Sequence, residues 1–329
     1  MSDSVVSVSG LKKYYKVHKK EPGLKGSLKS LFSRKYEDVK AVDEINFKID
    51  EGELVGFIGP NGAGKTTTLK CLSGLLYPDG GVTSVLGFTP WERKKDYLKQ
   101  IAFVMGQKNQ LWWDLPAVET FNLNKEIYEI SPEKYKKTLG ELVSLLEVKD
   151  ILKVQVRKLS LGQRMKCELI AALLHQPKVL FLDEPTIGLD VVMQKKIRDF
   201  LSEYNKRHQA TIILTSHYMD DVKELAKRVV IINKGKVIFD GFLEEIIKKF
   251  ANHKTITAVF GKPVLKEDLK GIGKVKEFDP LKASIMVKRS AASLAAAEIL
   301  QRFPVDDLTI EEPPIEDIIR ELFTGKDYA

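Results

Sequence analysis

Gly59-Pro60-Asn61-Gly62-Ala63-Gly64-Lys65-Thr66 is the stretch of sequence that decides the fold. It satisfies the P-loop pattern G-x-x-x-x-G-K-[ST], and it lies between an apolar run at residues 55–58 and a segment of helical character that reaches about Gly74. Glycines let the backbone fold around a phosphate with its N–H groups pointing inward, and Lys65 would reach the β- and γ-phosphates. This context favours a phosphate-binding loop over a glycine-rich turn that only joins a strand to a helix.

Two acidic residues farther along the chain fit the same chemistry. Asp183 and Glu184 come directly after a short apolar run. At the end of a strand, Asp183 can hold Mg²⁺ through water, beside the hydroxyl of Thr66. Glu184 can polarise an attacking water. The alternative is a pair of solvated acids in a turn before Pro185, and the P-loop upstream makes it the weaker interpretation.

Short β-like runs alternate with segments of helical periodicity, which predicts an α/β domain. The runs at residues 179–182 and 212–214 are continuously apolar, as expected of parallel strands at the centre of a sheet. Residues from about 115 to 175 carry little strand signal, and Ser131-Pro132-Glu133 is typical of a helix start, so we expect a helical insertion at about residues 108–175. The β-like runs lie at residues 5–8, 45–49, 55–58, 179–182, 212–215 and 229–232.

Composition changes after Asp240-Gly241, where a hairpin around residues 233–236 ends. We therefore predict one nucleotide-binding domain at residues 1–240 and a small α/β appendage at residues 241–329. Nothing in the appendage resembles a catalytic constellation. Its expected elements are a helix, two strands and two helices, at residues 242–250, 255–260, 283–287, 291–300 and 315–323.

Length and composition exclude several classes of protein. The chain has 329 residues, of which 43% are hydrophobic, enough for a sizeable core and a smaller second domain. Its two cysteines, Cys71 and Cys167, show no metal-site or disulfide spacing, which favours a reduced, cytosolic compartment. No run approaches the roughly 18 apolar residues of a membrane-spanning helix, and no signal-like segment follows the polar start, so we expect neither secretion nor membrane insertion.

The net charge of +8 is concentrated near the N-terminus, where residues 1–40 hold ten Lys or Arg against four Asp or Glu. Residues 16–40 look like an insertion, in which four apolar residues fall on one helical stripe among basic ones: Leu24, Leu28, Leu31 and Phe32. A basic amphipathic helix at an anionic membrane surface and a flexible solvated loop both fit this segment. Nucleic-acid binding is not expected, because the charge is confined and no nucleic-acid module accompanies it.

Further motifs occur around the P-loop and the two acids. Leu159-Ser160-Leu161-Gly162-Gln163 begins a helix about 20 residues before the acids, and Gly188-Leu189-Asp190 and Thr215-Ser216-His217 follow them. Gln107 lies between the P-loop and the Leu-Ser-Leu-Gly-Gln segment. In this order the motifs resemble those of the ATP-binding cassette superfamily, over about residues 5 to 240. The resemblance implies an α/β, P-loop NTPase (RecA-like) core with an antiparallel β subdomain and a helical insertion, followed here by the small C-terminal α/β appendage.

The resemblance implies a role for each matching residue. The catalytic residues would be Glu184, His217, which contacts the γ-phosphate, and Gln107, which reaches the metal and the attacking water. Asp190 would belong to the loop that communicates across a dimer. Tyr15 resembles the aromatic residue on which adenine stacks, with Tyr14 as an open alternative. The implied metal ligands are Thr66, Gln107 and Asp183, and the implied nucleotide-binding residues are Tyr15, Gly59, Pro60, Asn61, Gly62, Ala63, Gly64, Lys65, Thr66, Thr67, Ser160, Gly162, Gln163 and Asp190.

One position departs from the family's pattern, because Leu161 stands where the motif has glycine. In the family this segment contacts the γ-phosphate of the partner subunit's ATP, with Ser160 and the backbone near Gly162 as donors. Both donors are retained, and a leucine side chain that points away is compatible with the role. The segment is therefore still expected to take this role, although the departure speaks against fast turnover.

The resemblance also implies how the chain works. Two cassettes, expected to be a homodimer, would face head to tail, with each ATP held between one subunit's P-loop and the other's Ser160 segment. ATP and Mg²⁺ are the expected cofactors. We expect an ATP-hydrolysing subunit at the cytoplasmic face of the cell membrane, peripheral to it, which powers a bacterial exporter with a separate permease chain.

The segment at Trp112 and Trp113 lies where such cassettes receive a short cytoplasmic helix of the permease. Packing of the helical insertion is the alternative role for these two residues. The competing function for the whole chain is a soluble cassette ATPase in translation or on chromosomes. Those proteins resemble tandem cassettes or carry long coiled coils, and this sequence has neither.

Overall fold

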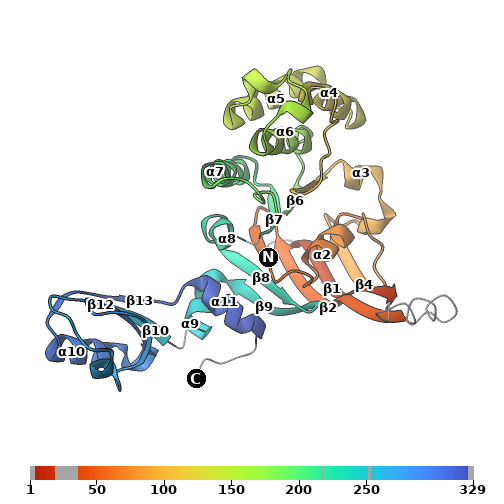
Figure 1. Cartoon of the computed structure of the whole chain (residues 1–329). Helices are drawn as coiled ribbons and strands as arrows, with labels where there is room; N and C mark the ends of the chain where they lie inside the picture. Colours follow the sequence, from red (N-terminus) through yellow and green to blue (C-terminus); the bar gives the residue numbers. More distant parts are fainter. Residues whose placement is uncertain (1–3, 19–35, 217, 251–252, 325–329) are drawn as a thin grey trace, which may run out of the picture. The chain divides into compact units, whose positions relative to one another are not determined.

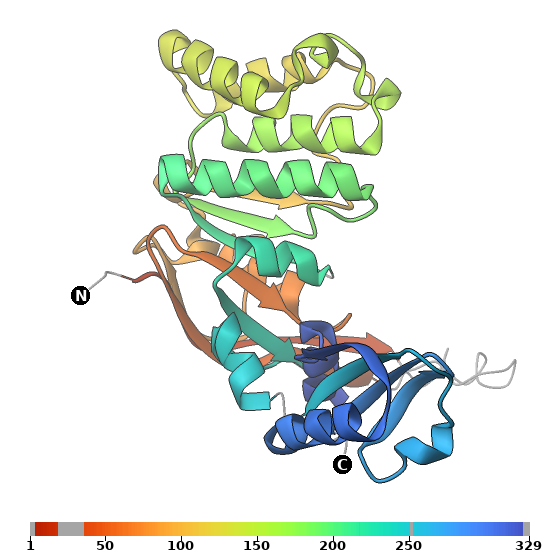
Figure 2. The same cartoon turned by 90° about the vertical axis from the view of Figure 1, so that its left-hand side faces the viewer.

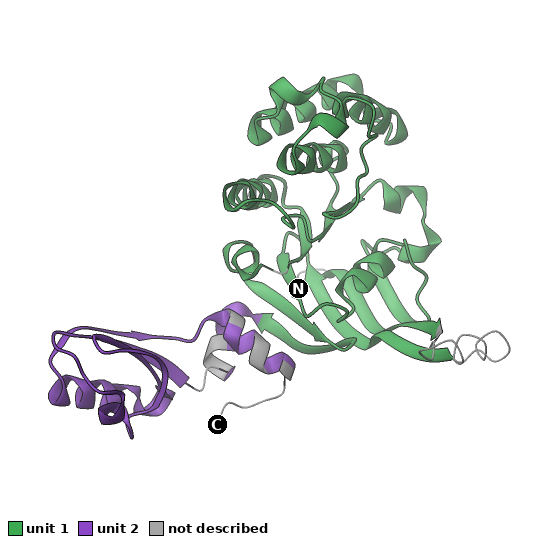
Figure 3. Cartoon of the chain, viewed as in Figure 1, with its two compact units in different colours: residues 1–241 green, residues 242–329 purple. Residues whose placement is uncertain are grey.

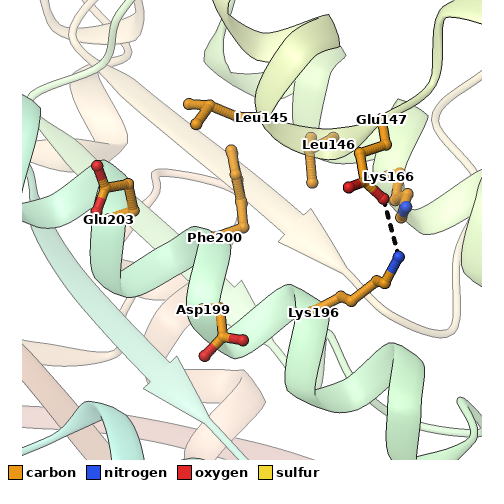
Figure 4. Close-up of a pocket in the computed structure, with 8 residues that line it drawn as sticks. All are labelled: Leu145, Leu146, Glu147, Lys166, Lys196, Asp199, Phe200 and Glu203. Carbon is orange, nitrogen blue, oxygen red and sulfur yellow. Dashed lines mark hydrogen bonds and ion pairs between the residues drawn. The ribbon is translucent and has the colours of Figure 1, made fainter.

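The computed structural model describes residues 4–18, 36–216, 218–250 and 253–324. The chain divides into two compact units, residues 1–241 and residues 242–329, which are coloured separately in Figure 3. We call them unit 1 and unit 2 and describe each by itself. Within the described ranges, no helix is long and apolar enough to cross a membrane.

Unit 1 is built on a six-stranded sheet with the strand order β5-β6-β7-β3-β8-β9. The first five of these strands run parallel to one another. All residues of β7 and the apolar residues of β6 are buried, which confirms the two runs that the sequence places at the sheet's centre. The strands are β3 (Leu54–Ile58), β5 (Ile101–Met105), β6 (Val179–Asp183), β7 (Thr211–Thr215), β8 (Arg228–Asn233) and β9 (Lys236–Phe242).

Three helices lie together at one end of unit 1, α4 (Ala117–Ile127), α5 (Pro132–Leu146) and α6 (Leu161–Leu173) (Figures 1 and 2). α5 begins where the Ser-Pro pattern predicts, because the Ser131 hydroxyl accepts a hydrogen bond from the backbone N–H of Lys134. The three helices share one hydrophobic core with α7 and with β6 and β7. The remaining helices in the described part of unit 1 are α2 (Lys65–Leu72), α3 (Lys95–Leu98), α7 (Val191–His208), α8 (Met219–Leu225) and three short 3₁₀ turns, Pro90–Glu92, Lys149–Ile151 and Val156–Lys158.

A second sheet of unit 1 is antiparallel, with the order β2-β1-β4 for β1 (Ser4–His18), β2 (Tyr36–Asp50) and β4 (Gly80–Val85). β1 pairs with β2 along its whole length, so that His18 faces Tyr36. The hairpin therefore includes both ends of the predicted basic insertion, residues 16–40. Residues 16–18 and 36–40 extend the hairpin, since an apolar or aromatic residue recurs at every second or third position there and suits a paired strand. The predicted amphipathic helix falls on residues 19–35, outside the described residues.

Unit 2 has a four-stranded antiparallel sheet with the order β11-β12-β10-β13. One face of the sheet packs on α10 (Ala292–Arg302), through a core that includes Ile256, Ala258, Ile285 and Ile299. The strands are β10 (His253–Phe260), β11 (Lys274–Asp279), β12 (Lys282–Lys288) and β13 (Val305–Glu311), and the other helices are α9 (Leu243–Phe250), α11 (Ile315–Thr324) and the 3₁₀ turns Lys266–Leu269 and Arg289–Ala291. The expected elements are present, and β11 and β13 are additions to them.

Candidate functional site

The P-loop runs from the end of β3 to the start of α2, as the sequence predicts. Gly64 has a φ of +110°, and a Cβ atom there would lie 2.2 Å from the carbonyl oxygen of Ala41 on β2. A Cβ on Gly59 would lie 2.2 Å from the carbonyl oxygen of Ile232 on β8. Only glycine fits these two positions, so both sheets of unit 1 fix the path of the loop.

Lys65 is the charged residue of the loop. Its side chain is buried, and its ammonium donates hydrogen bonds to the carbonyl oxygens of Gly59 (2.6 Å) and Pro60 (3.1 Å). Burial lowers the pKa of Lys65, while the nearby carboxylates of Glu184 and Asp183 oppose that shift. The ammonium is thus held at the loop in a place where a phosphate would bring it a stronger, charged partner.

Thr66 and Asp183, two of the predicted metal ligands, are in direct contact. The Thr66 hydroxyl lies 2.9 Å from each carboxylate oxygen of Asp183, and the Thr215 hydroxyl donates to one of these oxygens at 2.8 Å. A hydroxyl and a carboxylate are hard oxygen ligands of the kind that Mg²⁺ prefers. Among the described residues, no group of three or more His, Cys, Asp or Glu could hold a metal by itself. The donor set therefore fits an Mg²⁺ ion that arrives with nucleotide phosphates.

Glu184 lies in a strained position at the end of β6. Its φ is +56°, and its backbone N–H donates to the carbonyl and the hydroxyl oxygens of Thr215, both at 3.1 Å. The side-chain amide of Gln107 donates to a carboxylate oxygen of Glu184 at 3.3 Å. A positive φ in a residue other than glycine is costly, and such strain is often kept where a side chain must be aimed. The structure thus brings Gln107 and Glu184 together.

Ser160 and Asp190 both cap helices. The Ser160 hydroxyl accepts from the N–H of Gln163 (3.2 Å), whose side-chain oxygen accepts from the Ser160 N–H (2.9 Å), and Asp190 accepts from the N–H of Met193 (2.9 Å). The Gln163 side chain, predicted to bind nucleotide, is therefore engaged in the cap of α6. The hydroxyl proton of Ser160 and the first N–H groups of α6 remain the donors for a ligand at this end.

The two helix starts also touch each other. A Cβ on Gly188 would lie 3.1 Å from a terminal carbon of Leu161, so the leucine packs toward the segment before Asp190. A Cβ on Gly162 would lie 2.7 Å from the Met193 side chain. Leu161 is thus accommodated inside one chain, and a side chain at position 162 would require the Met193 side chain on α7 to move.

The two candidate adenine-stacking residues differ in their surroundings. The Tyr14 hydroxyl donates to Asp43 at 2.7 Å, and the Lys40 ammonium lies 5.5 Å from the centre of its ring. Tyr15 is 37% exposed. Adjacent residues of a strand point to opposite faces, so only one of the two rings can meet a given ligand. Tyr14 is committed to Asp43, which favours Tyr15 as the stacking residue. His217 lies outside the described residues.

The structure contains a buried ion pair next to the site, and its residues are not among the predicted site residues. Asp221, on α8, is fully buried, and it accepts hydrogen bonds from the hydroxyls of Thr186 (2.5 Å) and Ser216 (2.6 Å) and from the guanidinium of Arg198 (3.0 Å). It thereby joins the segment after Glu184, the loop after β7, and α7. In the sequence Asp221 follows another aspartate at a helix start, where acids are ordinarily exposed, so no local signal marks it.

Replacing Asp221 with asparagine is expected to lower the free energy of unfolding by about 2 kcal/mol, because the guanidinium of Arg198 would lose the buried one of its two charged partners and keep only Glu224. Urea unfolding followed by circular dichroism would measure the change. Asp220→Asn is the matched control, since Asp220 is the neighbouring, exposed acid. Equal midpoints for the two variants would contradict a structural role for the buried pair.

Comparisons with known proteins agree with this geometry. Residues 42–187 match the family model "ABC transporter", and residues 252–311 match "EvrA-like ABC transporter, C-terminal domain". The chain is 34% identical over 218 residues to the ABC transporter ATP-binding protein NatA of Bacillus subtilis, an alignment that covers 65% of this chain and 88% of NatA. The chain therefore belongs to the ATP-binding proteins of ABC transporters, a family of ATPases.

Two further relatives extend the comparison. An uncharacterized ABC transporter ATP-binding protein of Methanocaldococcus jannaschii, MJ1023, is 30% identical over 280 residues, which are 84% of this chain and 95% of that protein. The bacitracin transport ATP-binding protein BcrA of Bacillus licheniformis is 33% identical over 206 residues, or 63% of this chain and 66% of BcrA. The alignment with MJ1023 is longer than unit 1, whereas the alignment with BcrA is shorter than unit 1.

Solved structures confirm the cassette fold. An ATP-binding subunit of an ABC transporter superposes with a TM-score of 0.63 at 25% identity, over 75% of this chain and 93% of that one. The ATP-binding cassette MJ0796, as a dimer in a post-hydrolysis state bound to ADP and Pi, superposes with a TM-score of 0.59 at 24% identity, over 72% of this chain and 98% of that one. The predicted α/β, P-loop NTPase core is confirmed by these likenesses.

Proposed function

We propose that the chain hydrolyses ATP at a site shared between two copies, and so powers an exporter whose permease is a separate polypeptide. One observation carries the hydrolytic part. A continuous run of contacts leads from the P-loop to the Gln107 segment, through Thr66, Asp183, Thr215, Glu184 and Gln107. The first members of the run can hold a metal–phosphate group, and the last two can orient a water beside it.

The roles follow from the positions of the side chains. Lys65 would bind the β- and γ-phosphates from within the loop, and Thr66 and Asp183 would hold an Mg²⁺ ion that neutralises phosphate charge. The Glu184 carboxylate takes up a proton from the attacking water, and the Gln107 amide keeps that carboxylate aimed through its hydrogen bond. His217 completes the proposed catalytic set on the evidence of its motif.

Two copies of the chain are required for a complete site in this proposal. The N-terminus of α6, with the Ser160 hydroxyl and the N–H of Gly162, supplies donors and positive potential for the γ-phosphate held by a partner's P-loop. ATP then acts as a ligand that favours the closed dimer, and hydrolysis removes that preference. A dimeric cassette with ADP and Pi among the solved relatives supports this arrangement.

The proposed permease contact is an exposed apolar patch in the segment between β5 and α4. Trp112 is 52% exposed, Trp113 is 48% exposed and Leu115 is 38% exposed. Exposed aromatic side chains in one segment are typical of protein interfaces. The guanidinium of Arg164, on α6, lies 5.6 Å from the centre of the Trp113 ring, so a partner at this patch would also reach the helix that Ser160 begins.

The patch yields a direct test of the transporter proposal. The paired change Trp112→Ala and Trp113→Ala is expected to reduce recovery of the permease on the tagged cassette about tenfold or more, since buried tryptophans at interfaces contribute about 2 kcal/mol or more to binding. Tyr77→Ala is the control, because Tyr77 is a 69% exposed aromatic residue elsewhere in unit 1. Unchanged co-purification from membranes would leave the two tryptophans as packing residues only.

The proposal also includes the direction of transport and the location of the chain. The single cassette and the short C-terminal appendage resemble the cassettes of bacterial exporters of drugs, antibiotics and polysaccharides, and a relative named for bacitracin transport supports an antibiotic-like substrate class. The chain would lie on the cytoplasmic face of the membrane, peripherally, through its permease. Uptake of a labelled substrate by inverted vesicles that contain both chains, and none by right-side-out vesicles, would establish the direction.

A further inference from the structure

Glu168 is a buried acid outside the proposed catalytic set. It lies on α6, in the helix that Ser160 caps, and only 3% of it is exposed. One of its carboxylate oxygens accepts hydrogen bonds from the backbone N–H groups of Gln110 (2.9 Å) and Leu111 (3.2 Å). Both donors belong to the loop that begins with Gln107.

The carboxylate is costly to bury. Burial raises the pKa of Glu168, and the two N–H groups and the guanidinium of Arg164 oppose that shift. Its second oxygen is buried and has no hydrogen-bond partner within the described residues. A leucine at this position would avoid that cost but would leave two backbone donors without an acceptor. The carboxylate of Glu168 therefore serves the backbone donors of the loop and adds nothing to the packing of the apolar core around it.

The loop is attached to two different parts of unit 1. At its start, the N–H of Gly106 donates to the carbonyl oxygen of Asp183 (2.9 Å) and Gln107 donates to Glu184 (3.3 Å). At its end, Glu168 holds the backbone of Gln110 and Leu111, and the Gln110 side chain donates to the carbonyl oxygen of Phe103 on β5 (2.6 Å). Only two residues, 108 and 109, separate the two attachments.

Because the connection is short, a movement of α6 can displace Gln107. Three residue steps span roughly 10 Å at full extension. A shift of α6 away from Gln107 therefore displaces Gln107 once these three residue steps are fully extended. The residues that follow are also fixed to the helical end of unit 1, because the carbonyl oxygens of Trp113 and Leu115 accept from the N–H groups of Arg157 and Val156, both at 3.0 Å.

We propose that Glu168 is a positioning residue for Gln107. It joins the Gln107 loop to α6, so that the position of α6 determines the contact between Gln107 and Glu184. This inference rests on the proposed function, in which the first residues of α6 contact the partner's nucleotide. An ordinary structural role for Glu168 would affect stability and leave the catalytic step alone. The two roles differ in whether Gln107 is needed for the effect.

A double-mutant cycle in the purified full-length chain separates them. Glu168→Leu is expected to lower kcat for ATP about tenfold, in line with the cost of misplacing a catalytic group, and to leave KM unchanged. In a Gln107→Ala background, Glu168→Leu is expected to cause no further loss of kcat, because it acts through Gln107. Glu168→Gln keeps an oxygen for both N–H groups and is expected to restore most of kcat.

Asn124→Ala is the matched control. The Asn124 side chain joins α4 to α6 by a hydrogen bond to the carbonyl oxygen of Ala171 (3.0 Å), one that involves no residue of the loop. This variant tests whether any loosening of α6 lowers kcat. Equal loss from Glu168→Leu with and without Gln107, or equal loss in Asn124→Ala, would overturn the proposal.

Hydrogen exchange supplies a readout that needs no ATPase activity. Glu168→Leu is expected to speed exchange of the amides at residues 107–111 and to leave those of α6 unchanged, and Glu168→Gln is expected to restore protection. Unchanged exchange in the leucine variant would overturn the proposal whatever the activity. If the wild-type chain and permease together hydrolysed no ATP, the proposed function would fail, while the exchange result would still decide whether Glu168 holds the loop.

Discussion

A chain with Glu184 replaced by glutamine is expected to bind MgATP as the wild type does and to hydrolyse it about 10²- to 10⁴-fold more slowly, the range that a general base contributes. The amide is nearly the same size as the carboxylate, and the backbone bonds from Glu184 to Thr215 do not depend on the side chain. The amide cannot take up the proton of the attacking water. Binding and hydrolysis should therefore separate in this variant.

Steady-state phosphate release measures the effect, and calorimetry with MgATP shows that binding is retained. Glu51→Gln is the control for an acid-to-amide change, because Glu51 is exposed at a turn of unit 1. Release at the wild-type rate would show that Glu184 is not the base. The same result would also remove the reason for its strained backbone at the end of β6.

Replacing Lys65 with alanine is expected to weaken binding of MgATP roughly ten- to a hundredfold, because a hydrogen bond to a charged group contributes about 1.5–3 kcal/mol. The structure places the Lys65 ammonium on the P-loop, bonded to Gly59 and Pro60, so the side chain is already directed to the place that the phosphates would occupy. Its loss removes the main charge that the loop offers to the β- and γ-phosphates.

Isothermal calorimetry with MgATP measures the affinity of the Lys65→Ala variant. Lys70→Ala serves as the control, since Lys70 lies in the last turn of the same helix, α2, away from the loop. The control should bind as the wild type does. Affinity that is unchanged in Lys65→Ala would contradict the phosphate-binding role of the loop.

The sequence predicts the core of unit 1 because its strongest signals are local. Continuous apolar runs mark β6 and β7, and the Ser-Pro start marks α5. The strands that it misses have weaker local signals. β5 is a five-residue apolar run that periodicity cannot distinguish from a piece of buried helix, and β13 contains two aspartates, which are disfavoured in strands.

The residues of the candidate site also fall into those that the sequence predicts and those that it does not. Residues within ordered motifs, such as Thr66, Asp183 and Glu184, could be named from the sequence because motif and neighbouring strand coincide. Asp221 and Glu168 could not, because each is defined by partners far along the chain: Thr186 and Arg198 for the first, the Gln107 loop for the second. A buried acid has no distinguishing mark in a sequence until its partners are placed.

The central claim is that the site between the P-loop and Glu184 is half of a shared one. The most direct test is the solution mass of the Glu184→Gln chain, measured by light scattering on a size-exclusion column with MgATP and with MgADP. Twice the mass of one chain is expected in MgATP, and the mass of a single chain is expected in MgADP. A single-chain mass in saturating MgATP, with one ATP bound per chain, would contradict the claim of a shared site.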